Sequence, residues 1–171
     1  MTKDTVRLLA AYNAYANEGM NAKLASMDPE IWERGFGGFF GSIKDQCAHI
    51  YKGDLTWLSR LAALRPFACA ASPILANPPK RDEVPFSSLD EYLRLRKALD
   101  ALITAFASEI TDEDLAAELS FTNWAGQAQV KNFGGLLMHL FNHGTHHRGG
   151  ISVYLDMAGV ENDFSNLIRL L

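Results

Sequence analysis

Apolar side chains recur every three or four residues along four long segments of this chain, and that spacing constrains the fold more than any other feature. The segments cover residues 4–25, 42–65, 88–110 and 132–159. Residues three and four apart lie on one face of an α-helix, so each segment is predicted to form an amphipathic helix of about 20 residues. Little of the chain shows the alternating pattern of a strand. The predicted fold class is therefore all-α.

Residues that commonly begin or end helices stand at several of the expected boundaries. Ser88 and Glu91 match the S-x-x-E capping box at the start of the third segment. Pro66 follows the second segment, and a helix does not readily continue across a proline. Gly159 follows the fourth segment and suits the left-handed conformation that ends many helices.

The connection between the second and third predicted helices is long and rich in proline. It runs from Pro66 to Pro85 and holds five of the six prolines in the chain, so we expect an irregular segment. Four amphipathic helices with one long connection are typical of a four-helix bundle. With 171 residues, of which 48% are hydrophobic, the chain fits a single domain covering residues 1–171.

The segment between the third and fourth predicted helices is the most ambiguous part of the chain. A short helix is expected at residues 112–118. Residues 119–130 could form a small hairpin about Ala125 and Gly126. The last residues of the chain are expected to fold back as a short apolar turn.

Charge and hydropathy exclude some classes of protein. The formal net charge is −4, whereas a nucleic-acid binder needs a basic face, so no nucleic-acid partner is expected. The short basic run from Arg94 to Lys97 is expected to be a solvated helix face. No window approaches the roughly 18 uninterrupted apolar residues of a membrane span, and the N-terminus does not read as a secretory signal, so we expect a cytoplasmic protein without a membrane partner. Cys47 and Cys69 lack CxxC spacing and are expected to be buried free thiols.

Four of the five histidines lie between His139 and His147, inside the fourth predicted helix. Positions four apart on a helix sit about 40° from each other and one turn along, so such a pair can hold one metal ion. His139 and His147 are about 12 Å apart along the helix axis, which is too far for a single ion. The pair is therefore either His139 with His143 or His143 with His147.

The remaining histidine, His49, lies among apolar neighbours in the middle of the second predicted helix. A third ligand has to come from another helix, and His49 is the candidate. Three imidazoles with an open fourth position suit a divalent ion such as Zn²⁺, Ni²⁺ or Fe²⁺. The alternative interpretation is structural, because a lone buried histidine is more often hydrogen-bonded than bound to a metal.

The run "FNHGTHHRGGISVYLDMAGV" resembles the signature of the DinB family, in which the fourth helix typically carries N-H-x-T-H-H-R-G-Q. The earlier run "GGFFGSIKDQCAHIYKGDLTWLSRL" resembles the family's second helix, with a phenylalanine-rich entry followed by a histidine, an aspartate and a tryptophan. The corresponding positions are Phe39, Phe40, Ser42, His49, Asp54 and Trp57. Because two separated motifs occur in the family's order, the chain is identified as similar to the DinB and YfiT-like metal-dependent enzymes.

The resemblance implies a metal triad of His49, His143 and His147 in a bundle of up-down-down-up topology that is often a homodimer. It also implies a hydrolase or a thiol S-transferase, in which the ion activates water or a low-molecular-weight thiol that attacks a small electrophile. One position departs from the pattern. Gly150 stands where the family usually has glutamine, and glycine has no side chain that could hydrogen-bond to a ligand.

Other polar residues near the predicted triad are weaker candidates for a catalytic role. His146 lies beside a predicted ligand, and Asp45 lies one turn before the predicted ligand of the second helix, where it could orient the imidazole. Arg148 and Asp54 match the family pattern, although a salt bridge would equally explain them. His139 is expected to have a structural or interface role. A second class of function stays open: a non-catalytic dimeric bundle that binds metal in a stress-response or sensing role.

Overall fold

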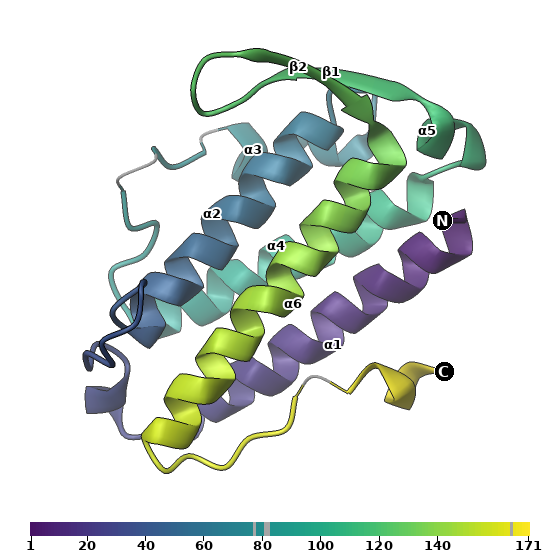
Figure 1. Cartoon of the computed structure of the whole chain (residues 1–171). Helices are drawn as coiled ribbons and strands as arrows, with labels where there is room; N and C mark the ends of the chain where they lie inside the picture. Colours follow the sequence, from purple (N-terminus) through teal and green to yellow (C-terminus); the bar gives the residue numbers. More distant parts are fainter. Residues whose placement is uncertain (77, 81–82, 165) are drawn as a thin grey trace.

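The computed structural model describes residues 1–76, 78–80, 83–164 and 166–171, and it shows a mostly helical chain with a small two-stranded sheet (Figure 1). The long helices are α1 (Lys3–Ser26), α2 (Ile43–Leu61), α4 (Leu89–Glu109) and α6 (Phe133–Met157). The shorter elements are η1 (Pro29–Ile31), η2 (Ala68–Ala71), α3 (Pro73–Ala76), α5 (Asp112–Ala116), β1 (Glu118–Thr122), β2 (Ala128–Asn132) and η3 (Leu167–Leu170). The long helices fall on the four segments predicted from apolar spacing. Within the described ranges, no helix is both long and apolar enough to cross a membrane.

The four long helices pack side by side. α1 contacts α4 and α6, and α2 contacts α6 and α4. In Figure 1, α1 and α6 run toward one end of the molecule, whereas α2 and α4 run toward the other. The connection between α2 and α4 therefore has to return along the length of the helices, which explains why it is long.

Apolar side chains from these helices form two buried clusters. One cluster lies toward the hairpin and includes Leu58, Ile103 and Phe133. The other lies at the opposite end of the helices and includes Met20 and Ile151. Burying a large apolar side chain contributes about 1.5–3 kcal/mol, so these two clusters hold the long helices together.

Each long helix begins at a side chain that accepts a hydrogen bond from the backbone of its first turn. These residues are Thr2, Ser42, Ser88 and Asn132. Such a cap typically contributes about 1 kcal/mol. The capping box predicted at Ser88 is only half formed, because the carboxylate of Glu91 accepts hydrogen bonds from the backbone N–H and the hydroxyl of Ser87, at 2.7 and 2.8 Å.

Strands β1 and β2 form an antiparallel hairpin between α5 and α6, as the sequence suggested. The register pairs Thr122 with Ala128. The side-chain oxygen of Asn123 accepts a hydrogen bond from the backbone of Ala125 at 2.9 Å, and Gly126 has a φ of 77° that favours glycine. An all-α description leaves out this hairpin.

Arg96 on α4 is fully buried, although the run from Arg94 to Lys97 was expected to face solvent. Its guanidinium donates to Asp54 on α2 at 2.7 Å and to Asp100 at 2.6 Å. Burial raises the pKa of both carboxyls, and the charge of Arg96 counteracts that rise. The expectation of a solvated face was therefore wrong for Arg96, which ties α4 to α2.

Arg148 on α6 is also buried and extends this polar network to α1. It donates hydrogen bonds to the side-chain oxygens of Asn13 at 2.7 Å and Asn17 at 3.1 Å. The amide of Asn17 in turn donates to Asp100 at 2.8 Å. The network joins all four long helices, and its two arginines balance the charge of its two aspartates.

Candidate metal centre

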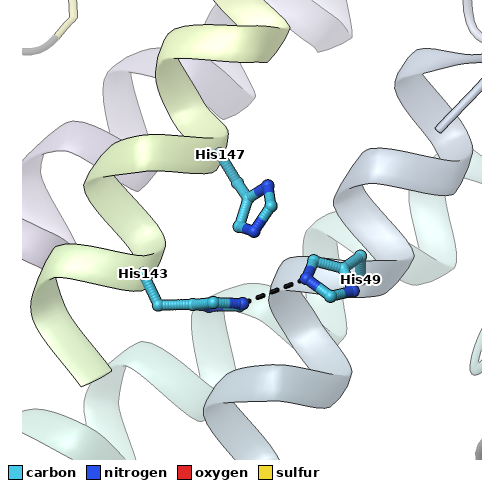
Figure 2. A group of neighbouring side chains, drawn as sticks. All are labelled: His49, His143 and His147. Atoms are coloured by element: carbon cyan, nitrogen blue, oxygen red, sulfur yellow. Dashed lines mark hydrogen bonds between the residues drawn. The ribbon is translucent and has the colours of Figure 1, made fainter. Parts of the chain in front are cut away.

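Three histidines from two helices point into the space between α2 and α6 (Figure 2). His49 comes from α2, and His143 and His147 come from α6. One potential ligand nitrogen from each ring lies within 4.8 Å of the others, and Nε2 of His49 is 3.0 Å from Nε2 of His143. Two nitrogens bound to one tetrahedral zinc ion lie about 3.3 Å apart. The spacing of the rings therefore fits a single ion.

Two of the three rings have a buried nitrogen without a hydrogen-bond partner. His147 is 8% exposed, and His49 and His143 are half-buried. In the described part of the chain, no group hydrogen-bonds to Nδ1 of His143 or Nδ1 of His147. An unpaired buried nitrogen costs free energy whichever role the ring has, and a ring that binds a metal through Nε2 normally pairs its Nδ1 as well. The case for a metal site therefore rests on the convergence of the three rings, in which Nε2 of His49 and Nε2 of His143 lie within hydrogen-bond distance of each other.

The surroundings keep the three imidazoles uncharged at neutral pH. Burial, together with the charges of the neighbouring histidines, lowers the pKa of His143 to about 3 and that of His147 to about 4. Burial and the charge of Lys52 also lower the pKa of His49. A neutral imidazole keeps the lone pair that binds a metal ion, so no proton has to leave these rings before an ion can bind.

Gly53 on α2 makes room for one of the ligand rings. A Cβ atom at this position would lie 2.6 Å from Cε1 of His143, so any other residue would force the ring to move. Gly53 was not among the site residues predicted from the sequence. The available signal was a glycine inside a predicted helix, one turn after His49, where glycine lowers helix stability and so often has a packing reason.

The glycine-rich loop before α2 places an aromatic ring against the triad. The ring centroid of Phe40 lies 4.5 Å from that of His49 and 5.2 Å from that of His147. Phe39 packs edge-on against Phe40 and is itself 97% exposed. Apolar side chains thus border the triad, and the outer one, Phe39, is exposed to solvent.

The three weaker candidates from the sequence form no hydrogen bond to the triad among the described residues. The carboxylate of Asp45 accepts a hydrogen bond from the hydroxyl of Ser42 at 2.7 Å, at the start of α2. His146 is exposed, and its ring centroid lies 4.8 Å from that of His147. Arg148 points into the buried network instead. Their suggested roles in catalysis stay predictions.

His139, the other histidine that could have paired with His143, lies outside the group. Its exposed ring packs edge-on against Trp57 with centroids 4.9 Å apart. The structure therefore brings together His143, His147 and His49, which is the set that the family resemblance implies.

The space beside Gly150 is filled by a side chain from α2. The amide of Gln46 lies so close to Gly150 that a Cβ atom there would overlap it. Gln46 is buried and stands one turn before His49, while Gly150 stands one turn after His147. An amide group is thus present beside position 150, but it comes from α2 and not from position 150 itself.

The group contains three ligands and has an open side. Among the described residues, no cysteine, aspartate or glutamate joins the three histidines, and two of the rings are partly exposed. The triad lines neither of two surface hollows of about 770 Å³ and about 820 Å³, which lie beside Trp32 and between α1 and α4. Three neutral imidazoles with an open position form the donor set of catalytic metal sites, whereas structural sites have four protein ligands.

Comparisons of the sequence and of the structure with known proteins both find DinB or DinB-like proteins. The sequence model of the DinB family matches residues 1–169. The protein DinB of Bacillus subtilis is 25% identical over 151 residues, which cover 88% of this chain and 84% of that protein. The crystal structure of a DinB-like protein from Bacillus subtilis matches with a TM-score of 0.65 and 16% identity, over 92% of this chain and 97% of that one. A DinB-like protein from Bacillus cereus matches with a TM-score of 0.60 and 24% identity, over 87% and 89% of the two chains.

Proposed function

Since the chain belongs to the DinB family, we propose that it is a metal-dependent enzyme whose divalent ion is held by His49, His143 and His147. The observation that carries the proposal is the convergence of these three rings, with potential ligand nitrogens within 4.8 Å of one another and no fourth side chain of a ligand type among the described residues. Zn²⁺, Ni²⁺ and Fe²⁺ all suit such a nitrogen donor set.

A divalent ion with an open position lowers the pKa of a bound water or thiol, which supplies a hydroxide or thiolate nucleophile near neutral pH. The residues of this chain would hold the ion and shape its surroundings. The low pKa values of His143 and His147 keep these rings neutral. The ring of Phe40 excludes water from one side of the triad. This arrangement serves a hydrolase and a thiol S-transferase equally well.

The metal is tested by loading the purified protein with each ion and measuring the bound metal per chain. We expect about one ion per chain, as a three-ligand site requires. His49→Ala and His143→Ala should lose the ion. His139→Ala is the matched control, because it removes an imidazole of the same helix that lies outside the group. Equal metal content in the His143→Ala and wild-type proteins would contradict the proposal.

The reaction is tested with the metal-loaded protein. Low-molecular-weight thiols combined with small electrophiles test the transferase, and generic esters and amides test the hydrolase. We expect turnover that disappears when a chelator removes the metal and returns when the ion is restored. His49→Ala should be inactive under all of these conditions.

The second candidate is a metal-binding protein without catalysis that serves in sensing or in a stress response. The observation that favours it is the lack of a carboxylate beside the triad among the described residues, since a hydrolase commonly uses one as a general base. A fully loaded protein that turns over none of the thiols, esters and amides would favour this candidate. Metal-dependent turnover would exclude it.

We also propose that two copies of the chain associate through the outer face of α1 and α4. The hollow of about 820 Å³ on this face is lined in part by Ala14, Ala101 and Ala105, whose small side chains permit close helix approach. Glu18 and Lys97 line the same hollow, so this face carries charges of both signs that could pair between two copies. Ala101→Glu should convert a dimer to a monomer in light scattering, and an unchanged mass would contradict this interface.

We also infer that the four long helices form a four-helix bundle of the up-down-down-up type. The support is that α1 and α6 run one way in Figure 1 while α2 and α4 run the other. Contacts of α1 with α4 and α6, and of α2 with the same two helices, also support a closed bundle.

A further inference from the structure

Arg60 lies on the same face of α2 as His49, about three helical turns further along. Eleven positions separate the two residues, and a rotation of about 100° per residue leaves them only about 20° apart around the helix. Gly53 and Thr56 lie on this face between them. At the far end, Nη2 of Arg60 donates a hydrogen bond to the backbone carbonyl of Thr122 at 3.0 Å. One face of α2 therefore runs from the metal centre to the hairpin.

Aromatic rings connect Arg60 to the triad step by step. The Cζ atom of Arg60 lies 4.9 Å from the ring centroid of Trp57. The Trp57 ring lies 4.9 Å from the ring of His139, which lies 5.9 Å from the ring of His143. His139 is exposed and Trp57 is partly exposed. We call Arg60, Trp57 and His139 the aromatic strip, and one side of it faces solvent.

The guanidinium of Arg60 is held in place but not neutralised. Besides the Trp57 ring, its Cζ atom lies 5.1 Å from the ring centroid of Phe121 and 5.5 Å from that of Trp124. No salt bridge joins it to a carboxylate of the described residues. A guanidinium has five N–H donors, and the bond to Thr122 uses one of them. The remaining donors could bind a planar anion through two parallel hydrogen bonds.

We propose that the aromatic strip binds an elongated ligand whose carboxylate pairs with Arg60 while its other end reaches the metal centre. This proposal rests on the proposed function and assigns a substrate class to the same site. One guanidinium carries a single positive charge, and its paired N–H donors match the two oxygens of a carboxylate, so the ligand is expected to be a monoanion. His139 is exposed and Trp57 is partly exposed, and aromatic side chains of this kind suit an apolar or aromatic middle part of the ligand.

The helix sets the length of this ligand. Eleven residues of α2 rise about 16 Å. The Arg60 side chain leans back over Trp57, toward His49, so the guanidinium and the triad are closer than this rise, at about 10–15 Å. The substrate or cosubstrate is therefore an extended molecule with a carboxylate at one end and its metal-binding atom at the other.

A different role for Arg60 would be to fasten the hairpin to α2 through Thr122 and the rings of Phe121 and Trp124. In that case, a change at Arg60 would alter stability and leave the preference among ligands unchanged. The dependence of affinity on the length and charge of the ligand therefore distinguishes the two roles.

The probes are ω-mercaptocarboxylates of increasing chain length, tested against ω-mercaptoalcohols of the same lengths. The protein is loaded with Co²⁺, because thiolate-to-cobalt charge-transfer absorption reports binding of the thiol at the metal. We expect mercaptoundecanoate to bind about tenfold more tightly than mercaptoundecanol, as one charge-assisted hydrogen-bonded pair allows. Mercaptopropionate is too short to reach Arg60 and should show no advantage over mercaptopropanol.

Arg60→Met keeps the apolar stem of the side chain and removes its charge. We expect this variant to lose the tenfold preference for the long acid while it binds mercaptopropanol as the wild type does. Arg94→Met, at an exposed arginine of α4, is the control and should keep the preference. Thermal unfolding followed by circular dichroism establishes that both variants are folded.

The outcomes separate this proposal from the proposed function. Equal affinity for the long acid and the long alcohol, or a preference that survives in Arg60→Met, overturns the carboxylate site while the metal centre stands. If Co²⁺ does not bind, or if no thiol reaches it, the proposed function fails and the present proposal fails with it.

Discussion

Gly53 on α2 lies against the ring of His143 on α6, where a Cβ atom would come within 2.6 Å of Cε1. The position of the His143 ring, a proposed metal ligand, thus depends on the absence of a side chain at position 53 of the facing helix. Glycine inside a helix costs about 1 kcal/mol relative to alanine, so this position gives up helix stability for space beside the ring.

Gly53→Ala is expected to weaken metal binding without unfolding the protein. The new methyl group displaces the ring of His143, and a shift of a few tenths of an ångström is enough to disturb the coordination geometry. We expect a loss of metal affinity of about tenfold or more, comparable to the loss of a group that orients a ligand. Titration with Zn²⁺ against a competing chelator measures it.

Gly149→Ala is the matched control, because a Cβ atom at this helical position of α6 meets nothing within 4 Å. It should bind metal as the wild type does and raise the thermal midpoint through helix propensity alone. Unchanged metal affinity in Gly53→Ala would show that the ring of His143 does not need this space.

The sequence predicted the four long helices because their apolar faces repeat over many turns. The spacing of the histidines left two possible pairs on the fourth helix, and the resemblance to the DinB family selected His143 with His147. His49 was the candidate for the third ligand because it is the only histidine outside that helix. It could not predict Gly53, since the spacing of histidines on one helix says nothing about room on another. The burial of Arg96 was missed because the basic run around it looked solvated, and only the packing of α2 against α4 brings Asp54 to it.

Arg96→Met is expected to destabilise the protein strongly. The change leaves the buried carboxylates of Asp54 and Asp100 without their cation, and breaking a buried ion pair in this way typically costs about 3–5 kcal/mol. Urea unfolding measures the loss. Arg94→Met, two positions away and exposed, should change stability by less than about 1 kcal/mol. A similar midpoint for the two variants would mean that the buried network contributes little to stability.

Asp114 should make stability depend on pH in the acid range. Hydrogen bonds from Arg65 and from Thr111 lower the pKa of this carboxyl from 3.8 to about 2. A folded-state pKa below the unfolded value means that the ionised carboxylate stabilises the native state at pH values above about 4. This stabilisation is lost as the pH falls from about 4 through about 2.

Asp114→Asn tests this dependence by urea unfolding between about pH 6 and about pH 2. The range ends at the folded-state pKa of Asp114, which is about 2. The variant should be less stable than the wild type at the upper end of the range, and the difference should shrink toward the lower end. Asp112→Asn, an exposed acid two positions earlier, is the control and should not produce this convergence. A stability difference that stayed constant with pH would contradict the role given to the Asp114–Arg65 pair.

Gln46 and Gly150 are expected to behave as a coupled pair, because the amide of Gln46 occupies the space that a side chain at position 150 would need. Gly150→Gln alone restores the residue that the family pattern usually carries, but it forces two side chains into one volume, and overpacking of this kind costs about 1–3 kcal/mol. Gln46→Ala opens that volume, so adding it to Gly150→Gln should recover most of the loss. A double-mutant cycle on the free energy of unfolding should therefore show a coupling of about 0.5–3 kcal/mol. If the two changes are simply additive, Gln46 is able to move aside, and Gly150 is not required by the packing of α2 against α6.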